Sequence, residues 1–328
     1  DLPLSRGLGD VYKRQICHWG AVKMFARPYG YTTDNSHPGV PLRTAPSQDP
    51  LPRATVDDVY DQIVDDLNFA ADNLPVENGV YATQDAARAY LAQVHFLMGN
   101  YTEAANFASE VINSGRYTLD EDLDRFETDV MNTETVFGIV SMPNDFRSSW
   151  FRDNLRSDNN PSPQLAFSED FDLFMSLSGG GDGRSAWLTA GTRPLINRFN
   201  EKEYFNVPLA HLTLMHLIRA EAFGESNSDL ATAIADINAI RDRAFGTGNN
   251  DLSAASTAQE VINAARDEFR KETACEGLWT DQLLRRGAIG EDITIRDAFW
   301  DCPGMSLQFS NTESTVQGFE LNEEGGCL

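Results

Sequence analysis

The sequence predicts a mostly all-α fold: a TPR-like scaffold of helical hairpins with an irregular, loop-rich excursion. The first observation is the junction at residues 99–105, where two segments with helically spaced apolar residues meet. Gly99, Ala104 and Ala108 are small enough to let two helices cross closely there. The second observation is that further amphipathic segments flank this hairpin. Such hairpins bury their apolar faces by stacking on neighbours. Because they present surfaces and perform no chemistry, we expect a binding protein.

The first part of the chain is expected to alternate between loop and helix. Residues 1–15 form a polar stretch that does not match the rest of the chain, and we interpret them as an artefact or a disordered tail. A helix then ends before Pro28, and a proline-rich loop extends to Pro52. Loops of this length in compact domains tend to be functional. Thr55 is a good N-cap for the next segment, an amphipathic helix.

TPR-like helices are predicted over residues 55–115 and 208–287. Between them, residues 134–142 favour a short strand. Residues 143–206 then break the helical pattern with glycines, prolines and scattered aromatic residues, which indicates an irregular excursion. We expect residues 16–328 to form a single domain that carries this excursion.

Composition excludes several classes of partner. The chain has 328 residues, of which 41% are hydrophobic, so it can bury a substantial core. Its formal net charge of −24 disfavours nucleic acid and anionic lipid headgroups, because both need Lys and Arg. No apolar run is long enough to span a bilayer. The sequence predicts no metal site, since its Cys and His residues lack ligand spacing.

The sequence leaves two interpretations of Cys302 and Cys327 open. Cys302 and Cys327 flank a tail with little helical pattern, and a disulfide between them would fit an oxidising compartment. Two free thiols are the alternative. Cys275 lies in a helical pattern and is interpreted as a packed small residue.

Candidate ligand-binding residues lie in the two loop-rich regions. Sugars bind through aromatic rings that stack on their C–H faces and through planar polar side chains that satisfy their hydroxyls. For the aromatic residues, the alternative is that they pack the loops onto the scaffold as small satellite cores. The candidates are Tyr29, Tyr31, Asn35, Trp150, Phe151, Arg152 and Trp187.

Charged residues on the later helices suggest a competing, catalytic interpretation. Glu268, Glu272 and Glu276 are spaced by one helical turn each, and glycoside hydrolysis uses a pair of carboxylates. Arginines lie beside these glutamates, so we favour a charge-paired helix face and no enzymatic activity. Interhelical ion pairs are expected for a further set of residues: Arg219, Glu221, Arg241 and Arg243.

Several short motifs occur in one order along nearly all of the chain after residue 16. Each is weak alone, and the ordered set is more specific. They are His18-Trp19, Gly39-Val40-Pro41-Leu42, Arg53-Ala54-Thr55-Val56, the hairpin at 86–117, Gly181-Asp182-Gly183-Arg184, the helical segments 217–222 and 237–244, Glu268-Phe269-Arg270 and Arg285-Arg286-Gly287. On these residues, the chain resembles the SusD/RagB family of outer-membrane nutrient-binding lipoproteins. It departs from the family pattern at His211 and Trp279, where the family usually has Arg.

This resemblance implies a cell-surface protein that binds a glycan or another nutrient and delivers it to a SusC-like TonB-dependent outer-membrane transporter. It implies no catalysis and no cofactor. The family usually carries a signal peptide, a lipidated Cys and further helices before this point, so we expect a truncated chain whose membrane contact is a lipid anchor outside this fragment. The competing functions are a helical glycoside hydrolase and a soluble TPR-type adaptor that binds peptides.

Overall fold

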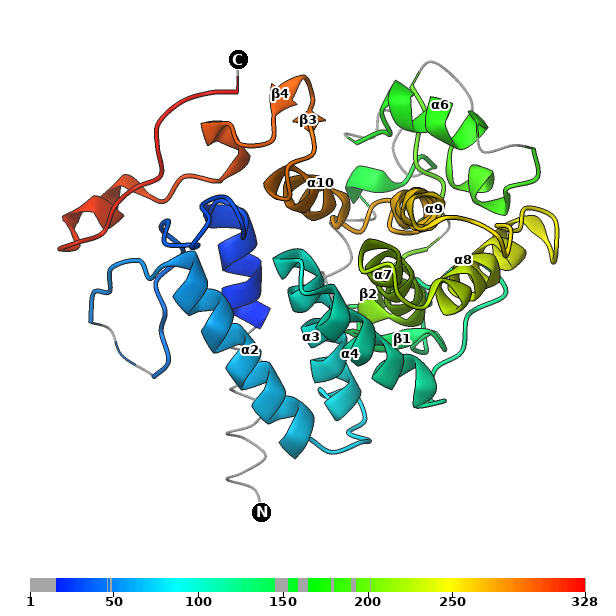
Figure 1. Cartoon of the computed structure of the whole chain (residues 1–328), viewed down its shortest axis with the longest axis horizontal. Coiled ribbons are helices and arrows are strands. Elements are labelled where there is room, and N and C mark those ends of the chain that lie inside the picture. The colour runs from blue at the N-terminus through cyan, green and yellow to red at the C-terminus, as the bar shows by residue number, and fades with distance from the viewer. Residues whose placement is uncertain are drawn as a thin grey trace. The chain divides into compact units, whose positions relative to one another are not determined.

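The computed structural model describes residues 16–45, 47, 49–144, 153–158, 165–177, 180–189, 193–200 and 202–327. This part of the chain is mostly α-helical and TPR-like, as predicted, with two short two-stranded sheets (Figure 1). Its residues group into two compact units. One is discontinuous and consists of Asp1–Phe107 with Thr273–Leu328, and the other is Ala108–Glu272. The single domain expected over residues 16–328 stays a prediction.

The discontinuous unit starts with a helix over residues 16–25 and continues, after the long loop, with α2 (Val56–Asn73). Thr55 is the N-cap that the sequence predicted: its side chain accepts a hydrogen bond from Asp58 N, 3.1 Å away. The helix packs against α3, and this contact stabilises an amphipathic helix more than its intrinsic propensity does. Its buried residues are Val56, Val59, Tyr60, Ile63, Leu67, Ala70 and Ala71.

The predicted hairpin consists of α3 (Gln84–Met98) and α4 (Tyr101–Asn113). Gly99 ends α3 in the left-handed conformation, with φ at 78°, which is the usual role of glycine at a helix C-terminus. On the two sides of the turn, the rings of His95 and Phe107 stack with their centroids 5.6 Å apart. The local signals in the sequence therefore specified this turn correctly.

The end of the chain completes the same unit. α10 (Trp279–Ala288) packs on α3 and leads into a small antiparallel hairpin of β3 (Thr294–Ile295) and β4 (Ala298–Phe299). The tail beyond this hairpin contains two short 3₁₀ helices, η2 (Pro303–Met305) and η3 (Asn311–Thr315).

Hydrogen bonds fasten this tail to the helix over residues 16–25 and to the residue after it, and a disulfide closes the tail on itself. Cys302 and Cys327, the pair noted in the sequence, are joined, with their Cα atoms 5.4 Å apart. Leu307 N donates a hydrogen bond to Met24 O (2.8 Å), and Ser306 Oγ donates to Ala26 O (2.9 Å). The last part of the chain thus covers the segment that leads into the candidate loop.

The contiguous unit contains a two-stranded antiparallel sheet of β1 (Thr135–Ile139) and β2 (Val207–His211). The strand predicted at β1 is confirmed, but the prediction that a helix begins at Pro208 was wrong. The backbone of β1 offers pairing partners to this segment, and proline is tolerated on such an edge strand. The helix begins instead at Leu212, where the ring of His211 accepts a hydrogen bond from Leu214 N (3.2 Å).

Three helices form the centre of the contiguous unit: α7 (Leu212–Glu225), α8 (Leu230–Phe245) and α9 (Ala258–Glu272). α7 packs against both of the others, which explains why it is apolar around most of its circumference. One cluster of their buried residues comprises Ala220, Ala233, Ile234, Ile237, Val261, Ala264 and Ala265. None of the helices in the described ranges has both the length and the apolar character needed to cross a membrane.

The excursion at 143–206 is less irregular than the sequence suggested. It contains α6 (Glu169–Leu177), which the prediction missed, and the 3₁₀ helix η1 (Gly183–Trp187). Phe171 and Met175 are buried one helical turn apart and give α6 its apolar side. The candidates Trp150, Phe151 and Arg152 lie outside the described residues.

Candidate ligand-binding site

The loop that carries the first three candidates is fixed to the start of α2 by backbone hydrogen bonds. Asp57 N donates to Asn35 O (3.1 Å), and Gly39 N donates to Ala54 O (2.7 Å). A Cβ atom at position 39 would lie 2.9 Å from Thr55 O, so this approach requires glycine. A loop held in this way presents its side chains without a large ordering cost on binding.

Asn35 shapes the loop from inside. Its side chain is only 6% exposed, and its Oδ1 accepts a hydrogen bond from Gly30 N (2.6 Å). Its φ of 52° is in the left-handed region, which Asn tolerates better than most residues. The amide oxygen of Asn35 is thus used within the turn, and contact of this residue with a ligand stays a prediction.

Tyr31 is the candidate that the structure exposes. Its side chain is 37% exposed, and its ring packs edge-on against His37 (5.4 Å between centroids) and Trp300 (6.1 Å). The guanidinium carbon of Arg27 lies 5.0 Å from the Tyr31 ring centroid. Arg27 in turn donates to the carbonyl oxygen of Cys302 (2.6 Å). A ring that is fixed on several sides and open on another can stack on a sugar.

Tyr29 lies next to Tyr31 in sequence but is half-buried, and it packs on Tyr60 with 4.9 Å between ring centroids. Burial, followed by the charges of Asp57 and Asp61, raises the pKa of Tyr29, so its hydroxyl stays protonated. A pocket that is partly open to solvent adjoins this pair. Its lining residues are Val22, Lys23, Arg27, Pro28, Tyr29, Tyr60, Leu97, Asp281, Leu284 and Arg285.

Trp187 is part of the core of the contiguous unit. It is 8% exposed, and the guanidinium carbon of Arg198 lies 3.9 Å from its ring centroid. Arg198 also lies 4.7 Å from the centroid of Phe126. The ring therefore offers no open face to a ligand, and the alternative of a packed satellite core describes this tryptophan correctly.

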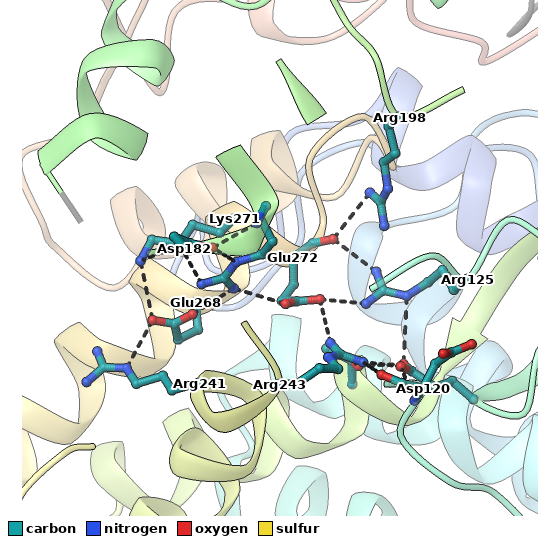
Figure 2. Close-up of polar contacts among 12 residues, drawn as sticks. Asp120, Arg125, Asp182, Arg198, Arg241, Arg243, Glu268, Lys271 and Glu272 are labelled. Carbon is teal, nitrogen blue, oxygen red and sulfur yellow. Dashed lines mark hydrogen bonds and ion pairs between the residues drawn. The ribbon is translucent and has the colours of Figure 1, made fainter. Parts of the chain in front are cut away.

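The glutamates of α9 are structural. Glu268 and Glu272 have no exposed surface, and Figure 2 shows their ion pairs with arginines from other parts of the contiguous unit. Glu272 pairs with Arg125 (2.6 Å) and Arg243 (2.8 Å), and Arg184 bridges Glu272 (2.9 Å) and Glu268 (2.8 Å). This arrangement is a buried network of charges and offers no cleft to a sugar.

The charges in this network reinforce its structural role. Burial alone would raise the pKa of Glu272, but the charges of Arg243, Arg184 and Arg125 outweigh it and hold the pKa well below its usual range. A general acid in glycoside hydrolysis needs the opposite shift. Within the ranges that the structure describes, no group of three or more His, Cys, Asp or Glu residues could hold a metal ion.

The Gly-Asp-Gly-Arg motif supplies part of the same network. Asp182 caps η1 by accepting a hydrogen bond from Arg184 N (3.0 Å) and also binds the Arg184 side chain through both carboxylate oxygens. The turn therefore delivers a fully buried guanidinium to the carboxylates of α9.

The predicted interhelical ion pairs are confirmed. Each of the four residues binds a partner on a neighbouring helix of the α7–α9 group. The pairs are Arg219–Asp236 (2.7 Å), Glu221–Arg266 (2.6 Å), Arg241–Glu268 (3.0 Å) and Arg243–Glu272 (2.8 Å).

Two residues at the site were not predicted from the sequence. Trp300 lies in a short hairpin near the end of the chain, and nothing in its local sequence connects it with Tyr31. Tyr60 has the spacing of a core residue of α2, and it is indeed buried. The prolines and glycines that marked the loop carried no information on either contact.

Two family models match the sequence. One, described as the SusD family, matches residues 201–301, and the other, described as starch-binding associating with outer membrane, matches residues 12–96. The second match begins inside the segment 1–15. Together the two matches cover more than half of the 328 residues. A search of curated proteins found no match.

Solved structures of SusD superfamily proteins share the fold. One from Bacteroides thetaiotaomicron is 20% identical and has a TM-score of 0.83, with 97% of this chain and 77% of that chain covered. One from Bacteroides vulgatus is 22% identical, with a TM-score of 0.79 and coverages of 94% and 74%. A SusD-like carbohydrate binding protein from Bacteroides vulgatus is 17% identical, with a TM-score of 0.70 and coverages of 91% and 65%. From the two family matches and the shared fold, we conclude that this chain belongs to the SusD/RagB-like family.

Proposed function

We propose that this protein binds a carbohydrate at the outer membrane and passes it to a SusC-like TonB-dependent transporter, held at the cell surface by a lipid anchor. Two comparisons support carbohydrate as the ligand class: the starch-binding description of one matching family and the description of one similar structure as a carbohydrate binding protein. The same family description supports the location.

The observation that carries the proposal is the exposed ring of Tyr31 on a fixed loop. Its 37% exposure leaves a surface free, while His37, Trp300 and Arg27 hold the ring in place. An aromatic platform that is already ordered loses little entropy when a pyranose stacks on it. We also propose that the protein does not hydrolyse its ligand, because the carboxylates of α9 are consumed by arginines.

Affinity electrophoresis against a panel of polysaccharides tests the proposal. The protein should be retarded by at least one glycan, and Tyr31→Ala should remove most of the retardation. Tyr81→Ala is the matched control, because Tyr81 is another tyrosine of the same unit and is 69% exposed. Unchanged mobility of the folded protein on every glycan would refute carbohydrate binding, and equal losses in both variants would refute the role of Tyr31.

Delivery to a transporter has its own test. The gene for this chain should lie beside one for a TonB-dependent transporter, and the two proteins should copurify from outer membranes. A transporter that is isolated without this protein, under conditions that preserve other outer-membrane complexes, would contradict the delivery role while leaving carbohydrate binding intact.

A further inference from the structure

Tyr60 carries a hydroxyl group that the fold does not use. The side chain is 4% exposed, and its ring packs edge-on against Trp19 (5.8 Å) and on Tyr29 (4.9 Å). These contacts would be equally available to phenylalanine. Among the described residues, no protein group forms a hydrogen bond with the Tyr60 hydroxyl. The hydroxyl oxygen is not among the fully buried polar atoms that lack a partner, so it reaches solvent, and a ligand in the same place could take over the hydrogen bonds that it makes with water.

The pocket beside Tyr60 offers that partner a place. Tyr60 lines it together with Tyr29, and an ion pair between Lys23 Nζ and Asp281 Oδ2 (2.7 Å) forms another part of the wall. The side chains of Lys23 and Asp281 are 21% and 18% exposed, so the pair is accessible from solvent. Burial raises the pKa of Tyr60 strongly, and the charge of Asp281 adds to the effect. The hydroxyl is therefore a permanent donor and acceptor.

The wall combines three kinds of polar group. Lys23 can only donate hydrogen bonds, Asp281 can only accept them, and the Tyr60 hydroxyl can do both. A sugar hydroxyl also donates and accepts, so two neighbouring hydroxyls could satisfy all three groups at once. Arg27 and Arg285 also line the pocket, and they already donate hydrogen bonds to Cys302 O and to Gln282 Oε1. A carboxylate or sulfate on the ligand can only accept, so it would bring no donor to Asp281 and would meet its negative charge.

We propose that this pocket is a second subsite, in which Tyr60, Lys23 and Asp281 bind vicinal hydroxyls on the edge of a neutral pyranose. The inference deepens the proposed function and rests on it, since the same loop places Tyr31 outside and Tyr29 at the pocket. The pocket is partly open to solvent and its enclosed part is small, so it can take only the edge of one sugar, with the rest of the glycan outside it.

Tyrosine ring signals in ¹³C NMR spectra provide the test, because the chain has nine tyrosines and single Tyr→Phe variants assign them. The probes are the methyl pyranosides of glucose, galactose, mannose and xylose, and methyl glucuronide, each titrated into the full chain. At least one neutral glycoside should shift the Tyr60 and Tyr29 signals in a saturable way. The glucuronide should bind more weakly than methyl glucoside.

The variant Tyr60→Phe should unfold at the same temperature as the wild type and bind the neutral glycoside about threefold to tenfold more weakly, which corresponds to one lost hydrogen bond. Tyr90→Phe is the matched control, since Tyr90 is a buried tyrosine of α3 outside the pocket, and its affinity should not change. Unaltered affinity of Tyr60→Phe would overturn the subsite.

The outcomes separate the two proposals. If the Tyr31 signals shift when a polysaccharide binds while the Tyr60 signals are unaffected by all the monosaccharides, carbohydrate binding stands and the second subsite is wrong. If the signals of neither residue shift, both proposals are wrong. Tighter binding of the glucuronide than of the neutral glycosides would refute the assignment of ligand charge.

Discussion

The indole of Trp300 lies directly against the backbone of Gly287. A Cβ atom at position 287 would come within 2.2 Å of the indole Cγ, a separation that real Cβ atoms do not show. The ring of Trp300 contacts Tyr31. The lack of a side chain at Gly287 therefore allows the indole to lie where it supports the Tyr31 ring. Glycine in the Arg-Arg-Gly motif thus has a packing explanation.

Gly287→Ala should displace Trp300 and weaken glycan binding. The added methyl forces the indole away, and overpacking of this kind costs about 1–3 kcal/mol. Tryptophan fluorescence and urea unfolding measure the two effects. Gly20→Ala is the control in the same unit, since nothing lies within 4 Å of its added Cβ. Alanine in that helix should slightly stabilise the protein. Full glycan affinity in Gly287→Ala would show that Trp300 does not position Tyr31.

Removing the disulfide should destabilise the discontinuous unit. Cys302 and Cys327 are 25 residues apart, and closing a loop of this size contributes about 3 kcal/mol. We expect the double variant Cys302→Ser/Cys327→Ser to unfold at a lower temperature, and reductant to have the same effect on the wild type only. Cys17→Ser controls for loss of an exposed thiol and should leave the unfolding temperature unchanged. Equal stability of the double variant and the wild type would contradict a stabilising role for the disulfide.

Glu272→Gln should cost about 3–5 kcal/mol of unfolding free energy, because it leaves buried arginines without their carboxylate. Glu225→Gln, in the partly exposed pair with Arg266, should cost at most about 1 kcal/mol. Urea unfolding compares the two variants. Neither variant nor the wild type should release reducing sugar from polysaccharides. If the wild type releases sugar and Glu272→Gln does not, the protein is an enzyme after all.

Mild acid should weaken the loop that carries Tyr31. Burial lowers the pKa of His37 below its ordinary value of 6.5, and the nearby charges of Arg27 and Arg53 add to the shift. The folded state therefore binds this proton less readily than the unfolded state. The contribution of His37 to the free energy of unfolding is fully present above pH 6.5, and it declines as the pH falls from there toward the folded-state pKa of His37.

Urea unfolding at about pH 7.5 and pH 5.5 measures this loss. His95 titrates in the same sense, since its pKa is also lowered by burial, so the variant His37→Gln should remove only part of the pH dependence. Glu272 does not contribute in this interval, because its unfolded-state pKa is near 4.5. An identical pH dependence of stability in the wild type and His37→Gln would show that His37 does not cause the loss in mild acid.

Features set by near neighbours in sequence were predictable. Thr55 caps its helix through a residue three positions away, and Gly99 ends a helix through its own backbone freedom. The strand at Pro208 was not predictable, because its partner β1 lies far away in the chain and apolar residues at that spacing fit a helix equally well. The burial of Trp187 was not predictable either, because Arg198 packs on it and also on Phe126, which lies far away in the chain.

The candidate site was predictable only in outline. The long loop and its tyrosines stood out in the sequence, and Tyr31 is exposed there. Which neighbours fix the ring depends on Trp300, almost the whole length of the chain away, and the pocket needs Lys23 and Asp281 to meet. Periodicity describes the face of one helix, and it does not say which residue from another segment will lie opposite.

The unit that holds the candidate site is assembled from two separate stretches of the chain, whereas the other unit is one uninterrupted stretch. During synthesis, the uninterrupted stretch is complete before α10 and the hairpin with Trp300 have been made. The neighbours of Tyr31 are therefore incomplete until residue 300 has been made. Premature termination between residues 272 and 300 would leave the contiguous unit whole and the surroundings of Tyr31 unfinished.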